Sequence, residues 1–230
     1  MRRVRSVGTN AFWIAVLLVA VLGAPGEATG QDLADLDYEH LEFRGVGFEV
    51  GYLFPTRVEN TPTYSVRFDM GYLGPGLRIV PSFTYWSSPF RVSEVTTLEE
   101  RVESLVRRAT GNPPPQVDLG VIEWTNYSLG LDSHVVWALP LNLLSFAGLG
   151  VSAHILDGSG AAIDGTFIED LLDSVTAGFN LHLGLEYPVT DRMRIQGQGR
   201  YSVMEDMQYF HLGLGGQILW GTLVPGEERR

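Results

Sequence analysis

A run of fourteen residues with strictly alternating polarity constrains the fold of this chain more than any other feature. Between Ser174 and Tyr187, every second residue is apolar or aromatic, and the residues between them are polar, charged or small. A period of two is the pattern of a β-strand whose two faces meet different environments. The run is about twice as long as a usual strand of about 5–6 residues. We therefore expect a long strand with one apolar face and one polar face.

Seven further segments repeat this alternation, and the connections between them follow an order. The segments cover 43–54, 62–73, 76–87, 121–138, 142–155, 192–204 and 207–220. Short turns at 73–76, 139–142 and 188–191 alternate with more variable connections at 55–61, 88–120, 156–173 and 205–206. An even number of strands, with short turns on one side and longer loops on the other, is typical of outer-membrane barrels. The sequence predicts an all-β fold over 42–221, an eight-stranded antiparallel transmembrane β-barrel with short helices in two extracellular loops.

The composition excludes several functional classes. The 230-residue chain has no cysteine, which rules out a disulfide framework, a thiolate metal site and a cysteine nucleophile. All 16 basic residues are arginine, and the formal net charge of -11 argues against binding to nucleic acid. Charged residues make up only 19% of the chain, which is sparse for a surface that faces water on all sides.

The N-terminus has the pattern of an export signal. A cluster of arginines within the first five residues precedes an apolar run over 11–24, and small residues follow. This order is that of a secretory signal peptide, with cleavage after Ala28 or Gly30. The alternative is a membrane anchor, but the run is shorter than the about 20 residues that span a bilayer. We expect an outer-membrane protein with a signal peptide at 1–30, a periplasmic lead-in at 31–41 and a C-terminal tail at 222–230.

Alternation alone does not say which face of the barrel points outward, because a soluble lipocalin-like barrel has apolar side chains inside. The polar faces lack lysine and would form a poor soluble surface, which favours the membrane. Aromatic residues also gather near strand ends, as in the two girdles of a membrane barrel. The girdle predicted at the periplasmic ends contains Tyr72, Trp137, Tyr187 and Trp220, and the outer one contains Tyr52, Tyr64, Tyr85, Trp124 and Tyr201. The expected partner of this face is outer-membrane lipid, and a soluble periplasmic lipid-binding barrel is the alternative fold.

The chain from about 42 to 220 resembles a known family, and two stretches carry the likeness. The segment from Leu183 to Arg192, continued by Gly199 to Ser202, resembles the late hairpin of small outer-membrane barrels of the OmpA transmembrane-domain and OmpX type. The glycine-rich segment from Leu212 to Gly216 resembles their last strand. The resemblance implies an eight-stranded outer-membrane barrel. The chain departs from the family pattern after Trp220, where members commonly end at the aromatic residue of the last strand.

Charges on the polar faces predict a filled lumen, because eight strands leave an interior just wide enough for side chains. Opposite charges that face each other across a hairpin help to fix the register of the strands. Three such pairs follow from the spacing: Asp69 with Arg78, Glu186 with Arg194, and Glu49 with Arg67. We expect a paired polar plug, and a narrow pore is the alternative.

The sequence predicts no catalytic, cofactor-binding or metal-binding residue. Asp132 and His134 share one face of a strand but Ser133 lies on the other, so this trio cannot form a Ser-His-Asp relay. Outer-membrane lipid A deacylases use a His-x-Ser pair that faces lipid, and no histidine here precedes a serine by two positions. The polar-face histidines His134, His154, His182 and His211 are best explained as hydrogen-bonded lumen residues. An outer-membrane lipid-modifying enzyme remains an alternative function.

Helix signals occur in the two long loops. In loop 88–120, Thr97 and Glu100 have capping-box spacing, and Gly111 follows the last turn. In loop 156–173, Thr166 and Glu169 have the same spacing. These helices either close the barrel as a lid or form a docking surface for a lipid, a small ligand or a protein partner. We therefore expect a barrel with a structural or surface-interaction role.

Overall fold

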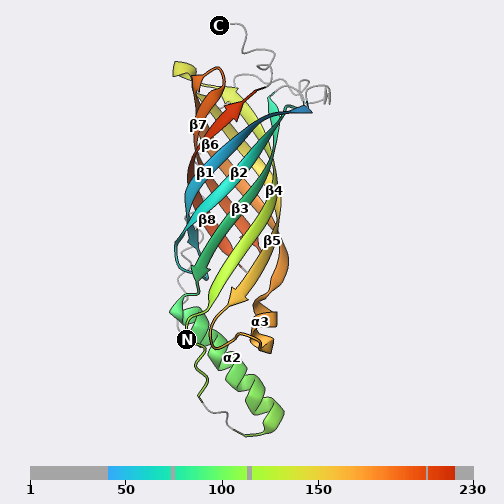
Figure 1. Ribbon diagram of the computed structural model, residues 1–230, viewed down its shortest axis with the longest axis vertical. Helices are drawn as coiled ribbons and strands as arrows, with labels where there is room; N and C mark the ends of the chain where they lie inside the picture. Colours follow the sequence, from blue (N-terminus) through green and yellow to red (C-terminus); the bar gives the residue numbers. More distant parts are fainter. Residues whose placement is uncertain (1–40, 74–75, 113–115, 206, 221–230) are drawn as a thin grey trace, which may run out of the picture. The chain divides into compact units, whose positions relative to one another are not determined.

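Eight strands form a closed antiparallel barrel in the computed structural model of the protein (Figure 1). Each strand pairs with its neighbours in the sequence, and the first pairs with the last. The strands are β1 Leu41–Pro55, β2 Thr61–Gly71, β3 Leu77–Pro89, β4 Glu123–Ala138, β5 Leu144–Ser159, β6 Ser174–Thr190, β7 Met193–Met204 and β8 Gln208–Leu219. This architecture confirms the predicted fold class.

The structure describes residues 41–73, 76–112, 116–205 and 207–220, all within the compact unit Asp37–Arg230. The predicted signal peptide, nearly all of the lead-in and the tail lie outside the described residues. Of the helices in the described part of the chain, none is both long and apolar enough to cross a membrane.

The hydrogen-bonded ladders run around the whole barrel. The longest joins β4 to β5, from Glu123 opposite Ser159 to Ala138 opposite Leu144. The closing ladder joins β1 to β8 and places Val50 opposite Leu214. Because a closed barrel has no free edge, its backbone groups are paired without water, as the interior of a bilayer requires.

The polar faces of the strands point into the barrel and the apolar faces point out. Along β8, Leu212 and Leu214 are exposed, whereas His211 and Gln217 are buried. The same alternation extends along β6 from Val175 to Tyr187, where the exposed positions are apolar and the buried ones are polar or glycine. This polarity is the reverse of that in a soluble barrel, whose apolar side chains fill the interior. A lipocalin-like arrangement is therefore excluded for these strands.

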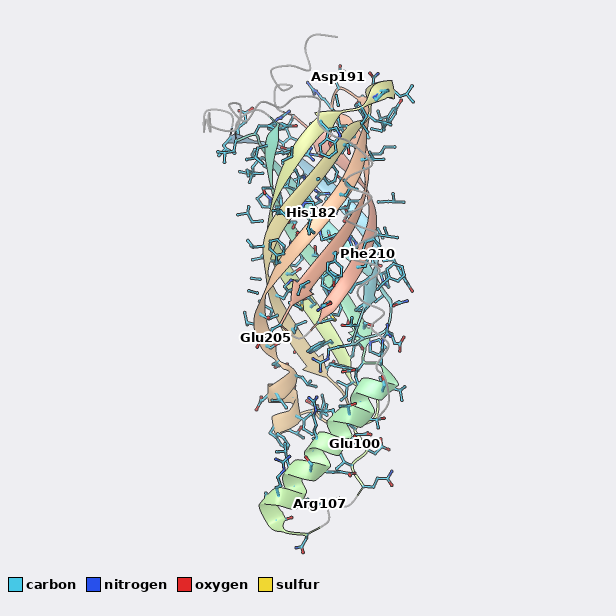
Figure 2. All side chains as sticks on the ribbon, turned by 180° about the vertical axis from the view of Figure 1, so that it is seen from behind. Glu100, Arg107, His182, Asp191, Glu205 and Phe210 are labelled. Atoms are coloured by element: carbon cyan, nitrogen blue, oxygen red, sulfur yellow. The ribbon has the colours of Figure 1, made fainter. Side chains whose placement is uncertain are left out.

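Short turns and helices lie at opposite ends of the barrel. Figure 2 shows Asp191, in the turn between β6 and β7, at the end opposite Glu100 and Arg107. Gly76 precedes β3 with a φ of 75°, a left-handed conformation in which glycine is favoured. The 3-10 helix η2, Pro140–Asn142, forms the turn between β4 and β5.

The helix α2, Val92–Thr110, begins five residues before the predicted cap. Thr97 therefore lies inside the helix, where its hydroxyl donates to the Ser93 carbonyl at 2.8 Å. The residue that precedes α2 is Arg91, which makes no side-chain cap, so the sequence carries no local signal for this start. The end agrees with the prediction, because Gly111 adopts a φ of 73° and donates its N–H to the Arg107 carbonyl.

The helix α3, Phe167–Leu172, begins at the predicted cap. The Thr166 hydroxyl accepts a hydrogen bond from the Ile168 N–H at 3.3 Å. The Glu169 carboxylate reaches back to the N–H of Gly165 at 2.6 Å, one residue beyond the partner in a standard capping box.

Candidate functional site

Charged side chains from six strands meet in the lumen. Their acids and arginines are equal in number, and each takes part in an ion pair within the group. All but one are strongly buried, and Arg200 remains slightly accessible at its side chain. The members of this lumen cluster are Glu49, Arg67, Asp69, Arg78, Asp132, Glu186, Arg194 and Arg200.

The structure brings together the three pairs expected from the sequence. A guanidinium nitrogen lies 3.4 Å from a carboxylate oxygen in Glu49–Arg67 and in Glu186–Arg194. In Asp69–Arg78 this distance is 3.9 Å. These pairs join neighbouring strands across hairpins, as the matching depths of their residues suggested.

Two further ion pairs cross between strands that are not neighbours, and sequence reasoning missed both. Arg78 of β3 contacts Glu186 of β6 through both guanidinium Nη atoms, and Nη1 donates to Oε2 at 3.0 Å. Arg200 of β7 donates to Asp132 of β4 at 2.6 Å. Such pairs depend on the curvature of the closed sheet, which cannot be predicted from the alternation of polarity or from the lengths of the turns.

Amide and hydroxyl groups extend the network around the carboxylates. Gln198 donates to Glu49 and Gln217 donates to Asp69, each at 2.9 Å. A buried carboxylate that is paired and hydrogen-bonded is far less costly than an isolated one. The amides therefore help the lumen cluster to persist away from water.

Two small cavities lie among the lumen side chains. One cavity of about 20 Å³ is lined by residues that include Ser152, His154 and Arg200. A second, of about 10 Å³, lies beside Arg67 and Arg78. Because a cavity needs about 10–15 Å³ to hold one water molecule, the first has room for about one water and the second just reaches that limit.

A second arrangement that the sequence analysis missed is a Ser-His-Asn relay inside the barrel. His154 Nε2 lies 2.8 Å from the Ser152 hydroxyl, and its Nδ1 lies 3.0 Å from Asn126 Oδ1. With the proton on Nδ1, the imidazole accepts from the serine, as in a nucleophile–base pair. The sequence does contain a signal for this arrangement, because the spacing Ser-x-His puts both side chains on one face of a strand. The adjoining cavity of about 20 Å³ has room for about one water molecule.

Most of the predicted girdle residues lie on the outer face. Tyr85 and Trp137 are half-buried, whereas five others are exposed. The exposed ones are Tyr52, Tyr64, Tyr187, Tyr201 and Trp220.

Two residues assigned to the girdles are buried instead, and their placement was wrong. Trp124 is 3% exposed because it shares the inward face of β4 with Asn126, whereas Tyr127 points outward. Tyr72 is 7% exposed because Gly71, with a φ of 76°, interrupts the alternation at the end of β2. The Arg44 guanidinium lies 5.4 Å from the centre of the Tyr72 ring.

An apolar cluster lies at the end of the barrel that carries the helices. Trp124 packs against Phe90 with ring centres 4.7 Å apart and donates its indole N–H to the Leu172 carbonyl at 3.0 Å. Val102 of α2 and Ile168 of α3 belong to the same cluster. Two acids of α2 also accept backbone hydrogen bonds from the segment that returns to β4, Glu99 from Leu119 and Glu103 from Val117.

These features define a small eight-stranded barrel with an apolar exterior and a polar, filled interior. Neisserial surface protein A has a similar structure, with a TM-score of 0.51 and 10% sequence identity over 77% of this chain and 97% of that one. This likeness supports the fold, a closed eight-stranded β-barrel.

Two further solved structures are similar at lower TM-scores. Ail of Yersinia pestis has a TM-score of 0.46 and 9% identity, covering 78% of this chain and 100% of its own. The N-terminal β-barrel domain of Pseudomonas aeruginosa OprF has a TM-score of 0.45 and 11% identity, covering 76% and 97%. No protein-family model and no curated protein sequence matches the chain.

Proposed function

We propose that this protein is an outer-membrane barrel with a structural or surface-interaction role and no chemistry of its own. One observation carries the proposal: a closed sheet holds its charges inside and presents apolar side chains outside. Such a surface is stable in hydrocarbon and aggregates in water. The export pattern in residues 1–30 supports delivery to the envelope, and the acidic lead-in suits the periplasm.

We propose that the side chains inside the lumen plug the barrel. The ion pairs and amides of the lumen cluster occupy its centre, and the apolar cluster with Trp124 and Val102 lies at one end. A water-filled pore needs a continuous polar path, whereas the two cavities described above have room for at most about one water each. Planar-bilayer recordings of the purified protein should show no stable conductance, and a large steady conductance would refute the plug.

The two helices close the barrel as a lid, and their free surface is the part that can meet a partner. Val102 and Leu172 are buried in the apolar cluster, whereas Leu105 and Leu171 remain exposed. Deleting residues 90–115 distinguishes a lid from a docking surface. If the segment is only a lid, its loss should leave the cell phenotype and any surface binding intact. If it is a docking surface, surface binding should be lost.

Envelope fractionation tests the location. The protein should co-sediment with outer membranes and migrate differently on gels with and without boiling, because a closed barrel resists detergent until it is heated. Recovery in the soluble periplasmic fraction, with no change of mobility on heating, would overturn the proposal.

A further inference from the structure

Three side chains with metal-ligating chemistry converge in the middle of the lumen. Asp132 and His134 project from one face of β4, and His182 projects from β6. One potential ligand atom of each lies within 4.8 Å of the other two. All three residues are buried, and Figure 2 shows His182 between the two ends of the barrel.

Each of the three residues also has one buried polar atom without a hydrogen bond. Asp132 Oδ1, His134 Nε2 and His182 Nε2 are buried and have no hydrogen-bond partner within the described part of the chain. A single orphaned polar atom in a buried site already calls for an occupant. One occupant that contacts all three, such as an ion or a water molecule, would account for them together.

Two glycines of β5 make this convergence possible. Gly148 pairs with His134 on one side and His182 on the other, and Gly150 pairs with Asp132 and Asn180. A Cβ on Gly148 would collide with His182 Nε2, and a Cβ on Gly150 would collide with Asp132 Oδ1. The bare backbone of β5 therefore forms the floor over which side chains of β4 and β6 meet.

The surroundings of two ligands fit a metal site. Histidine ligands usually donate their second ring nitrogen to an acceptor, and His182 Nδ1 lies 3.1 Å from Asn180 Oδ1. Asp132 keeps Oδ1 free because Oδ2 accepts from Arg200 at 2.6 Å. Asp132 and His182 thus each keep one potential ligand atom without a hydrogen bond.

His134 differs from the other two residues in where its proton lies. Arg78 Nη2 lies 3.2 Å from His134 Nδ1, so a neutral His134 carries its proton on Nε2. A metal ion at Nε2 displaces that proton to solvent and leaves an imidazolate that faces the Arg78 cation. The anionic ring offsets one charge of a divalent ion, and the Asp132 carboxylate is shared between the ion and Arg200.

We propose that Asp132, His134 and His182 bind one divalent transition-metal ion, with Zn²⁺ as the best match. Two imidazoles and one carboxylate are a donor set that Zn²⁺ takes with water in the fourth position, whereas Ca²⁺ and Mg²⁺ prefer oxygen ligands alone. The ion links β4 to β6 across the glycine floor of β5. A bridging water is the competing occupant, and metal content separates the two.

Metal analysis of the full-length protein tests the proposal. The protein is folded into detergent with and without Zn²⁺, or exposed to Zn²⁺ after folding, then dialysed and measured by plasma mass spectrometry. Each folded chain should retain about one ion, as one three-ligand site predicts. Binding measured by calorimetry in buffers of different ionisation enthalpy should show proton release. Folded wild-type protein that retains no Zn²⁺ under either loading condition would overturn the proposal.

Matched variants assign the ion to this cluster. H182N and D132N should lose the ion, whereas H154N should retain it because His154 already bonds Ser152 and Asn126. Asn180→Ala should weaken binding about 10–100-fold, as expected when the partner of a ligand histidine is removed. Mobility on gels before and after heating reports whether each variant has folded. Unchanged metal content in folded H182N and D132N would place the ion elsewhere and refute the assignment.

Discussion

Arg78 and Glu186 meet across the lumen through two guanidinium nitrogens and two carboxylate oxygens, although 108 residues separate them in the chain. Glu186 also contacts Arg194 of the adjoining strand at 3.4 Å. A paired arrangement of this kind gains strength from the low dielectric of the interior. It connects β3 to β6, whose backbones share no ladder.

Replacing Glu186 with Gln should destabilise the barrel by about 3–5 kcal/mol, because it leaves two buried arginines without their shared carboxylate. The free energy of unfolding can be measured by urea titration in lipid vesicles. The control is Glu94→Gln, which breaks the Arg57–Glu94 pair, whose side chains are 30% and 33% exposed. That change should cost less than about 1 kcal/mol. Equal effects of the two substitutions would contradict the role assigned to the lumen cluster.

Placing an arginine at Leu214 should cost about 2–4 kcal/mol, because this position lies near the middle of β8 on the lipid face. Leu141 is also strongly exposed but lies in the turn between β4 and β5, where water can solvate the charge. L141R should therefore change the unfolding free energy in vesicles very little. A cost for L141R as large as that for L214R would show that exposure on β8 does not mean contact with lipid.

Replacing Val102 with Asp should open the lid, because this side chain is buried in the apolar cluster at the end of the barrel. The loop between β3 and β4 should become sensitive to protease added outside, while the strands stay protected. Leu105 lies on the same helix but is 51% exposed, so L105D should leave the cleavage pattern unchanged. Equal protection of both variants would mean that α2 is not held by the cluster.

Replacing Gly150 with Ala should destabilise the barrel by about 1–3 kcal/mol, since the new methyl group overpacks the floor beneath Asp132 and Asn180. Gly47 is the matched control. It is also an inward-facing strand glycine, but a Cβ there meets its nearest atom at an ordinary 3.4 Å. G47A should be neutral or slightly stabilising in the same unfolding titration. An unchanged free energy of unfolding for G150A would show that Asp132 and Asn180 can shift to accommodate the methyl group, and it would contradict the tight packing over Gly150.

The strands and their faces could be read from the sequence because alternation follows directly from strand geometry. The run over 174–187 became β6, Ser174–Thr190, with the predicted faces. Hairpin partners such as Glu186 and Arg194 could also be expected to face each other, since a short turn sets their depth.

The errors have equally local causes. Trp124 was placed on the wrong face because it was grouped with strand-end aromatics, although its parity matches that of Asn126. The start of α2 was missed because no side chain caps it. The meeting of Asp132 and His134 with His182 could not be predicted, because it depends on glycines of the intervening strand and on the curvature of the sheet.

Quenching by brominated lipid tests most directly whether the apolar face meets the membrane. The chain has no cysteine, so single cysteines can be introduced along β8 and labelled with a fluorophore. Labels at Phe210, Leu212, Leu214 and Ile218 should be strongly quenched in vesicles of brominated lipid, and labels at His211 and Gln217 should be protected. Uniform quenching along β8, or none at any position of the folded protein, would contradict a barrel that spans the bilayer with its charges inside.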